Sequence, residues 1–431
     1  MSVYEGKSPL YPPAHMPAAN ATGSQRFIKR LGAAFVWQAM GKLLQIIGAA
    51  YAFRCLGPEN VGLTGTILTF TAFALILSDF GIERVAVRKI AREQDRLTEI
   101  TQAVFTLRFL IALLALASWC GISVSAYGLN LTGQIWILGG IYLFTGIVTS
   151  NWYFQATDNI PTFTAVQTGL SLATSVAYLL LFKRGQAVGS DLLVMTVLAA
   201  IVTVAVCIWM RRQIDGALLS LANIRSASDL LKEGHANWWF SLLYCALSTM
   251  SLPLCYWVLG EKEGGWFRGA SAFVGAIQLF LNNFAFMLNP RIVAWYKEDI
   301  PTFRKRVAQL SLGAVLTGCA AFAVVWPLRE WITHLLLGED FAPSAVLLPI
   351  LLFAKFLALS SGILIWGFLA GHKDNLAPRC CIAPLLAAIW LHSVLISSHG
   401  AVGVTIANVL GELLLLLVCA VAFSRAYAQP R

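Results

Sequence analysis

The amino-acid sequence predicts an all-α membrane protein with about twelve transmembrane helices and no soluble domain of any size. Two observations predict this class. Of the 431 residues, 58% are hydrophobic and only 12% are charged, whereas a soluble domain has roughly 25% charged residues. In addition, apolar stretches of spanning length follow one another along nearly the whole chain, and most charged residues lie in the short segments between them.

A transmembrane helix needs about 20 mostly apolar residues, because the hydrocarbon core of a bilayer is about 30 Å thick. Stretches that meet this requirement lie at 31–53, 61–82, 104–127, 134–155, 161–182, 188–209, 236–259, 268–289, 307–327, 343–370, 380–397 and 400–423. Residues 1–25 are polar and rich in proline and show no signal peptide, so we expect a disordered cytoplasmic tail there.

A polar, charged stretch lies midway between the first six and the last six predicted spans. It predicts an N-terminal six-helix lobe at 26–210, a cytoplasmic linker at 211–235 and a C-terminal six-helix lobe at 236–425. The loops on the outer side are short, and the longest runs from about Leu328 to Ala342. We therefore expect two lobes that face each other, without an extracytoplasmic domain.

Lysine and arginine predict the orientation, because cytoplasmic loops carry an excess of both. With twelve spans and a cytoplasmic N-terminus, 22 of these residues fall on the cytoplasmic side and five on the opposite side. We expect both termini in the cytoplasm and the lipid bilayer as a partner. The same rule accounts for the net charge of +10, so the basic total does not indicate nucleic-acid binding.

The cysteines give no sign of a metal site or a disulfide framework. Most of the nine lie within apolar stretches, and none has CxxC or Cys/His ligand spacing. Small apolar side chains in helices explain them. We therefore expect neither a metal nor a cofactor.

Polar residues recur at helical spacing in several predicted spans, as they do in helices that line a cavity. The faces of spans 31–53 and 268–289 are the most polar. The residues on them that we predict to line a cavity are Gln38, Lys42, Gln45, Arg268, Gln278 and Asn282. Serine and threonine stripes in spans 161–182 and 236–259 are better explained by hydrogen bonds between helices.

Two lysines lie well inside predicted spans, Lys42 in the first and Lys355 in the tenth. A lysine at such a depth costs roughly 2.5–3.5 kcal/mol on insertion scales. The only acid deep in a span is Glu412, in the last one, while Asp79 lies at the cytoplasmic end of the second. Two explanations stay open: a lysine–glutamate pair that joins two helices, and a cationic cavity that receives an anion.

Four stretches resemble motifs of one membrane-protein family. Phe53–Gly62 resembles its R-x-L-G-P-E-x-x-G signature after the first helix, and Leu77–Ile82 with Arg88–Arg92 its D-F-G and R-x-I-A-R end of the second helix. Asn151–Ala156 is similar to its W-Y-F-Q-G stretch, and Leu337–Ala342 to its G-x-x-F loop. The family is the O-antigen-type lipid-linked oligosaccharide flippases of polysaccharide biosynthesis, within the multidrug/oligosaccharidyl-lipid/polysaccharide exporter superfamily.

The resemblance implies two six-helix lobes around a central cavity and alternating access across a bacterial cytoplasmic membrane. It implies a polyprenyl-diphosphate-linked oligosaccharide as substrate, for O-antigen, capsule or exopolysaccharide synthesis, with polysaccharide polymerase machinery as a further candidate partner. The diphosphate is the anion that Lys42, Arg268 and Lys355 would meet, although the family motifs do not fix these three positions. Glu412 and Asp79 are the candidates for coupling to an ion.

Two alternatives differ in class. A drug or cation antiporter of the same superfamily relies on acidic residues in its N-terminal lobe, whereas the first span here carries Lys42 and no acid. A polyprenyl-dependent glycosyltransferase or polymerase needs a catalytic outer loop. The only cluster it could use is Glu330, His334, Glu339 and Asp340, which a solvated loop also explains. The sequence therefore favours a transporter that makes no covalent bond.

Overall fold

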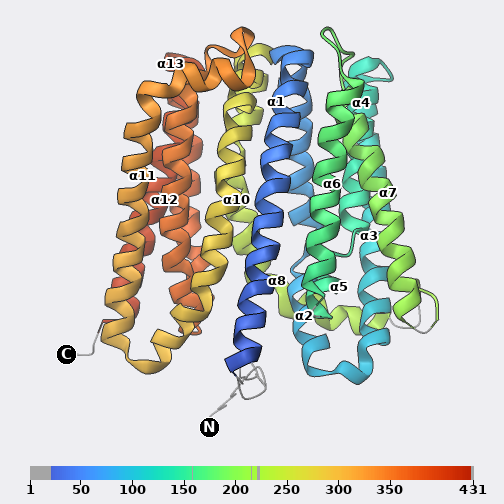
Figure 1. Cartoon of the computed structure of the whole chain (residues 1–431), viewed down its shortest axis with the longest axis vertical. Helices are drawn as coiled ribbons and strands as arrows, with labels where there is room; N and C mark the ends of the chain where they lie inside the picture. The colour runs from blue at the N-terminus through green and yellow to red at the C-terminus, as the bar shows by residue number, and fades with distance from the viewer. Residues whose placement is uncertain (1–20, 158, 215, 221–223, 429–431) are drawn as a thin grey trace.

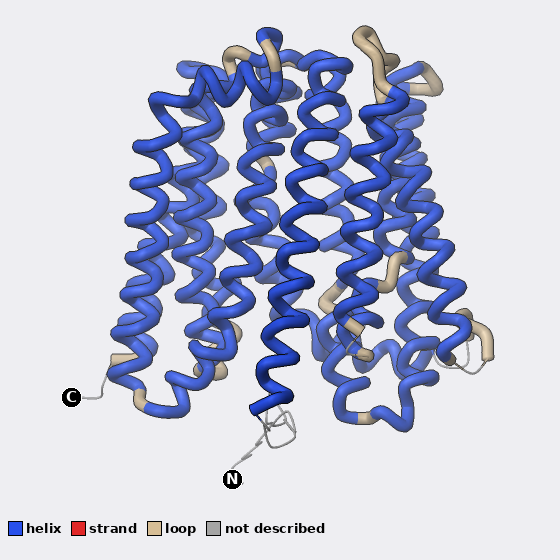
Figure 2. The backbone as a smooth tube through the Cα atoms, in the orientation of Figure 1, coloured by secondary structure: helices blue, strands red, loops and turns tan. Residues whose placement is uncertain are grey.

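The computed structural model describes residues 21–157, 159–214, 216–220 and 224–428, and all regular secondary structure in this part of the chain is helical (Figure 2). The first half of the chain contains α1 (Ala21–Asp79), α2 (Ile82–Arg92), the short helix η1 (Gln94–Arg96), α3 (Leu97–Tyr127), α4 (Leu131–Val148), α5 (Asn151–Ala156), α6 (Ile160–Leu181) and α7 (Ser190–Gln213). The second half contains α8 (Ile224–Thr249), α9 (Ser251–Leu254), the π-helical turn η3 (Cys255–Leu259), α10 (Glu261–Glu298), α11 (Ile300–Leu337), η4 (Glu339–Phe341), α12 (Ser344–Ala370) and α13 (Leu376–Ala426).

Two of these helices consist of two segments joined at a glycine. In α1 the backbone of Gly57 has φ 76° and ψ 164°, and the second segment starts with Pro58. Glycine adopts this positive φ without a Cβ clash, and proline suits the first position of a helix because it lacks an N–H group. In α13 the joint is Gly400, with φ 57° and ψ −139°. The sequence predicts both interruptions, which separate spans 31–53 from 61–82 and 380–397 from 400–423.

The bundle has two ends that we name by their content. The termini end is where α1 begins and α13 ends (Figure 1). The turn end is the opposite one, where the first segment of α1 reaches Gly57 and where α11 gives way to α12. Because α1 begins and α13 ends at the same end, the described chain crosses the bundle an even number of times.

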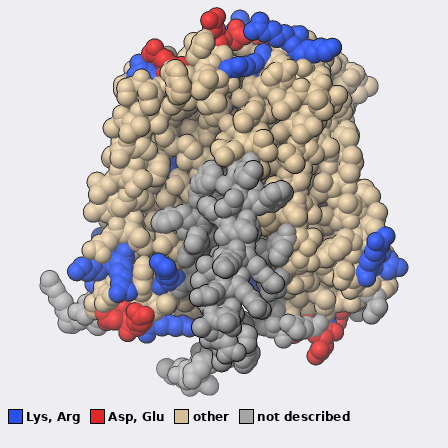
Figure 3. Space-filling model, viewed as in Figure 1, with Lys and Arg blue, Asp and Glu red and all other residues tan. Residues whose placement is uncertain are grey.

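The described helices have the length and the composition of membrane spans. Nine of them contain a stretch that is long and apolar enough to cross a bilayer, and two of these nine are the jointed helices α1 and α13. Figure 3 shows the charged side chains gathered toward the two ends of the molecule, with a wide band of other residues between them. The chain is therefore a multi-pass membrane protein, as the sequence predicts.

The two halves of the chain meet along α1 and α10. In Figure 1, α11, α12 and α13 lie on one side, α3, α4, α6 and α7 lie on the other, and α1 and α10 run between them. Glycines allow the close approach near the turn end: a Cβ atom at Gly62 would lie 2.8 Å from the amide nitrogen of Gly265. On its other side α1 packs on α6, where a Cβ atom at Gly48 would lie 2.7 Å from Ser175.

Several boundaries differ from those that the sequence predicts. The basic segment after the second span is the helix α2, because Ile82, Val85, Ala86 and Ile90 form one buried face at helical spacing. The expected outer loop from Leu328 is largely the last part of α11. The polar stretch that we expect at 211–235 is partly helical, since α7 continues to Gln213 and α8 already begins at Ile224.

The predicted span 134–155 is interrupted. Helix α4 ends at Val148, and the aromatic residues that follow form the separate helix α5. Trp152, Tyr153 and Phe154 are each 1% exposed, and the Phe154 ring stacks on Trp209 of α7 with a centroid distance of 4.9 Å. Three consecutive helical residues point in different directions, so burial of all three requires a helix that is covered on every side.

Candidate functional site

Two of the three predicted cations have described side chains, and both lie inside long helices. Arg268 belongs to α10 and Lys355 to α12, and both side chains are half-buried. Neither forms a hydrogen bond or an ion pair with another described residue. Lys42 lies in the first segment of α1, but its side chain, like those of Gln38 and Asn282, lies outside the described part of the structure.

Arg268 and Lys355 each share a helix face with a glycine that has no close neighbour among the described residues. Gly275 follows Arg268 by seven residues and Gly362 follows Lys355 by seven, so each glycine shares a face with its cation. A Cβ atom at either glycine would have no described neighbour within 4 Å. Because most of α12 is buried, the face that carries Lys355 borders space within the bundle that described side chains do not fill.

Arg268 reaches from α10 across α1 into the first half of the chain. A Cβ atom at Gly65 would lie 2.7 Å from Cγ of Arg268, so the arginine stem rests directly on the second segment of α1. The groups that act electrostatically on the guanidinium are Asp191, Tyr178 and Tyr142, of α7, α6 and α4. The cation thus belongs to one half of the chain by sequence and to the other by its surroundings.

Asp191 is a buried carboxylate that the sequence analysis does not single out. It is 5% exposed and lies in the first turn of α7. Its Oδ2 atom accepts a hydrogen bond from the Thr64 hydroxyl at 2.8 Å, whereas Oδ1 is buried without a hydrogen-bond partner among the described residues. An acidic residue in the first turn of a helix is normally solvated and stabilises the helix N-terminus. The position of Asp191 near the start of a span therefore does not indicate that its side chain is buried.

Lys355 lies near Glu412, the one deep carboxylate that the sequence identifies. Glu412 of α13 is 2% exposed and is the charged group that acts electrostatically on Lys355. Its Oε1 atom accepts a hydrogen bond from the Ser248 hydroxyl of α8 at 3.0 Å, and Oε2 has no described partner. The two charges are neighbours without a direct ion pair.

A directed chain of hydrogen bonds lies close to Glu412. Nδ1 of His392 lies 2.6 Å from the carbonyl oxygen of Ala388, so it carries the proton. Nε2 then accepts from the Ser251 hydroxyl at 3.0 Å, and Ser251 accepts from the Asn408 amide at 3.0 Å. These three polar side chains are buried. The arrangement suits a neutral His392. Of these three residues, the sequence analysis identifies only Ser251, as part of the polar stripe in span 236–259.

The predicted amides show mixed surroundings. Gln45 of α1 accepts a hydrogen bond from Ser171 of α6 at 3.5 Å, which joins two helices of the first half. Gln167, which we do not predict to line the cavity but which belongs to the polar stripe of span 161–182, donates to Asn151 at 3.3 Å. Gln278 lies on α10 and also has a polar partner. Along α6, therefore, at least part of the polar stripe serves helix–helix contact, as the sequence suggests for serines and threonines.

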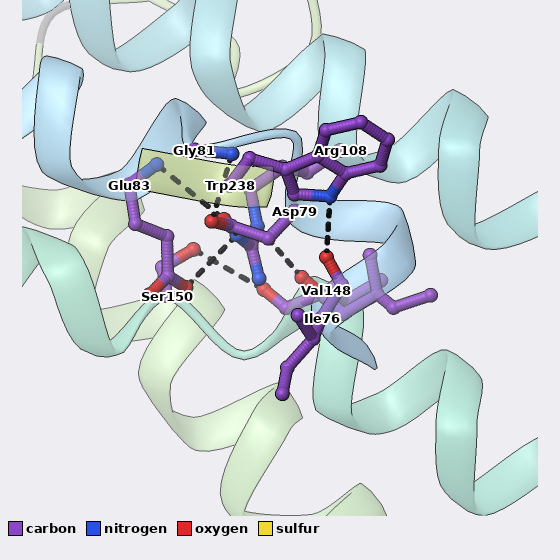
Figure 4. A network of polar contacts seen from close by, with 9 residues as sticks. Ile76, Asp79, Gly81, Glu83, Arg108, Val148, Ser150 and Trp238 are labelled. Atoms are coloured by element: carbon purple, nitrogen blue, oxygen red, sulfur yellow. Dashed lines mark hydrogen bonds and ion pairs between the residues drawn. The ribbon is translucent and has the colours of Figure 1, made fainter. Parts of the chain in front are cut away.

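Asp79 lies in a polar network at the termini end (Figure 4). Arg108, 5% exposed, forms ion pairs with Asp79 at 3.0 Å and with Glu83 at 2.8 Å, and its Nε donates to the carbonyl oxygen of Ile147. Asp79 also accepts a hydrogen bond from the Gly81 amide at 3.1 Å, which orders the turn between α1 and α2. The sequence does not reveal that Arg108, inside a predicted span, is the partner of this motif.

Beside this network the two halves of the chain are in contact. The indole N–H of Trp238, from α8, donates to the carbonyl oxygen of Ile76 at 2.9 Å (Figure 4). The Trp238 ring also stacks on Phe80. The Ile76 carbonyl belongs to the last turn of α1. Trp238 therefore ties the end of α1 to the other half of the chain.

Comparison with known proteins identifies the family and the fold. A family model described as polysaccharide biosynthesis protein matches residues 28–295. A comparison with curated protein sequences finds no significant match. Among solved structures, an inward-facing multidrug resistance MATE family transporter of the MOP superfamily aligns with a TM-score of 0.74 and 13% identity, over 90% of this chain and 94% of that chain.

Two further structures show the same fold. An outward-facing multidrug resistance MATE family transporter aligns with a TM-score of 0.64 and 13% identity, over 92% of this chain and 95% of that chain. A MOP superfamily transporter from Pyrococcus furiosus, described as having a reverse polarity of its binding pocket, aligns with a TM-score of 0.65 and 14% identity, over 92% and 95% of the two chains. Because the family model covers more than half of the sequence, the chain belongs to the polysaccharide biosynthesis protein family, with a fold like that of MOP superfamily transporters.

Proposed function

We propose that the protein is a flippase that moves a polyprenyl-diphosphate-linked oligosaccharide across the bacterial cytoplasmic membrane. The observation on which this rests is the pair of membrane cations, Arg268 and Lys355. Both lack a direct partner among the described residues, and each shares a helix face with a glycine that has no described neighbour within 4 Å. An unpaired cation inside a membrane protein is expensive and marks a substrate pathway by default. An anionic head group with a lipid tail is the substrate that such a site fits.

The cations occupy different depths along the bundle. Arg268 is seven residues into α10, Lys355 is eleven residues into α12, and Lys42 lies fifteen residues before Gly57. At 1.5 Å per residue these positions lie about 10, 16 and 22 Å from the turn end. A diphosphate that exchanges one cation for the next would keep a counter-charge over about 12 Å in the middle of a hydrocarbon core that is about 30 Å thick. Lysine and arginine both replace phosphate hydration well, as a point charge and as a planar fork respectively.

The mechanism that we propose is alternating access between two six-helix lobes, with twelve spans and both termini in the cytoplasm. The lipid tail stays in the bilayer while the head group enters between the lobes, and the lobes then rock about the site. Two features support this. Inward-facing and outward-facing structures exist for transporters of this fold. The contacts between the halves also lie at both ends, through Gly62 and Gly265 at one and Trp238 at the other.

A drug or cation antiporter is the second candidate. Asp191 and Glu412 favour it, because buried carboxylates are what a cationic substrate or coupling ion would meet. The multidrug transporters among the similar structures share the fold. At 13% sequence identity, that similarity is evidence for the fold alone and not for a drug substrate. The buried oxygens Oδ1 of Asp191 and Oε2 of Glu412, which have no hydrogen-bond partner among the described residues, equally suit a coupling ion or proton for a flippase.

Deletion of the gene, with complementation by the full chain, separates the two candidates. A flippase predicts loss of surface polysaccharide together with accumulation of lipid-linked repeat units on the cytoplasmic side. An antiporter predicts intact surface polysaccharide and a change in drug sensitivity alone. A fall in the amount of lipid-linked repeat unit would instead indicate an enzyme that acts earlier in synthesis.

A further inference from the structure

We propose that Asp191 is the resident counter-charge of Arg268 in the empty transporter, and that the phosphate of the substrate displaces it. Asp191 would then be a positioning residue. Before substrate binds, it would determine the position of the Arg268 guanidinium and how tightly the two halves of the chain pack. The inference rests on the proposed function, because it takes Arg268 as a cation that the substrate head group binds.

The first support is the direction in which Arg268 reaches. Its stem crosses α1 at Gly65, where a Cβ atom would lie 2.7 Å from Cγ and 2.8 Å from Cδ. The groups that act electrostatically on it all belong to the first half of the chain, and Asp191 is the only one of them with a carboxylate. The Arg268 stem contacts Gly65, and Asp191 is hydrogen-bonded to the adjacent Thr64, so the arginine of α10 and the carboxylate of α7 meet at the same turn of α1.

The second support is that both charges keep unused hydrogen-bonding capacity. Arg268 has no hydrogen bond or ion pair with a described residue, and Oδ1 of Asp191 is buried without a hydrogen-bond partner among the described residues, while Oδ2 accepts from Thr64. Each group attracts the other without direct contact. A guanidinium has five N–H donors and a carboxylate about four acceptor sites, so both keep most of their capacity for a ligand. A pair that was only a structural bridge would be expected to close this gap.

The consequence is a link between occupancy and packing. Removal of one partner from a buried charge pair is costly, because it leaves the other charge uncompensated. When the phosphate of the substrate binds Arg268, it replaces the attraction between Asp191 and this residue of α10. The contact between α1 and α10 at the turn end then weakens. Coupling of this kind is reciprocal, so separation of the two helices must also raise the affinity of Arg268 for phosphate.

A matched pair of variants separates charge from hydrogen bonding at Asp191. Asp191→Asn removes the charge but keeps an oxygen that can accept from Thr64, whereas Thr64→Val removes that hydrogen bond and keeps the charge. The first measurement is the affinity of the purified full-length protein for farnesyl diphosphate, with farnesol as the uncharged control. The second is the distance between spin labels at Leu129 and Glu339, on opposite halves at the turn end, without ligand and with the exposed Cys319 changed to serine.

We expect Asp191→Asn to bind farnesyl diphosphate about tenfold more tightly, which corresponds to 1.4 kcal/mol of released attraction. We also expect it to show a longer label distance without ligand, while Thr64→Val stays close to the wild type in both measurements. Unchanged or weaker binding together with an unchanged distance in Asp191→Asn would overturn the inference. Equal effects of the two variants would overturn it too, since hydrogen bonding would then be the cause.

The failure of the proposed function looks different. If the wild type binds farnesyl diphosphate no better than farnesol, the anion site is wrong, while the label distances still show whether Asp191 holds Arg268. If Asp191→Asn does not accumulate, the double variant Asp191→Asn, Arg268→Gln decides. The charge-pair account predicts that it accumulates, because no uncompensated charge is left, and continued loss of the protein would contradict that account.

Discussion

Gly265 of α10 lies against the main chain of Pro58 in α1, so closely that any Cβ atom at position 265 would overlap the Pro58 carbonyl group. The same contact includes Gly62, and an ion pair between Lys262 and Glu59 at 3.3 Å lies at its rim. Two helices from different halves of the chain therefore meet backbone to backbone at the turn end. Under alternating access this is a contact that has to open once in every cycle.

Gly265→Leu should prevent that contact from closing. Overpacking of a tight interface costs about 1–3 kcal/mol, and here the obstacle is backbone, which cannot rotate away. We expect turn-end cysteines to become more accessible to a membrane-impermeant thiol reagent without substrate, and transport to fall. Gly313→Ala is the matched control, because a Cβ atom on that exposed face of α11 has no neighbour within 4 Å. Wild-type labelling and transport in Gly265→Leu would refute this assignment.

Asp79 gives a prediction about coupling. Its ion pair with Arg108 and its hydrogen bond to Gly81 indicate a structural role at the end of α1. Asp79→Asn should therefore lower the thermal stability of the purified protein and leave the pH and ion dependence of transport unchanged. A shifted pH or ion profile at normal stability would instead assign Asp79 to coupling.

Arg108→Gln should be more harmful than Asp79→Asn, because it leaves both Asp79 and Glu83 without their cation. Removal of one partner from a fully buried pair costs roughly 3–5 kcal/mol. We expect a smaller loss here, since the two carboxylates are 27% and 36% exposed. Thermal unfolding of the two variants in the same detergent measures the order, and a more stable Arg108→Gln would contradict it.

Lys42 gives a prediction that depends on charge. If it receives the diphosphate, Lys42→Arg should retain part of the transport, because arginine also binds phosphate, with a different geometry. Lys42→Gln should lose most transport at normal membrane abundance, and Lys42→Glu should lose all of it through like-charge repulsion. Transport assays and immunoblots of the three variants side by side test this. Normal transport by Lys42→Gln would exclude Lys42 from the anion pathway.

Much of the fold could be predicted from local patterns. The apolar stretches place most of the long helices, and Gly57 followed by Pro58 marks the break within α1. The sequence does not predict the helix α2, because its composition is dominated by charged residues. Its buried face of Ile82, Val85 and Ile90 is evident only from their helical spacing. The break before α5 accompanies burial of three aromatic residues, two of which, Tyr153 and Phe154, pack on Trp209 of α7, a contact between distant parts of the chain.

The candidate site could be predicted only in part. Arg268, Lys355 and Glu412 stand out because a charge inside an apolar stretch is visible in sequence. Asp191 does not, since it lies in the first turn of a span, where a charge is normally solvated. Arg108 lies within the predicted span 104–127, but the sequence does not show its partners. Their burial follows from partners 127 and 29 residues away, Thr64 and Asp79. Pairings over such separations follow from tertiary packing and leave no periodic signal.

The most direct test of the central claim is transport by Lys355 variants in liposomes, measured as the movement of a fluorescent polyprenyl-diphosphate-linked sugar to the opposite leaflet. If Lys355 binds the diphosphate, Lys355→Arg should transport in part, whereas Lys355→Gln and the double variant Lys355→Gln, Glu412→Gln should both be inactive at normal abundance. If Lys355 only compensates Glu412, removal of both charges should restore activity. Wild-type transport by the double variant would contradict the account.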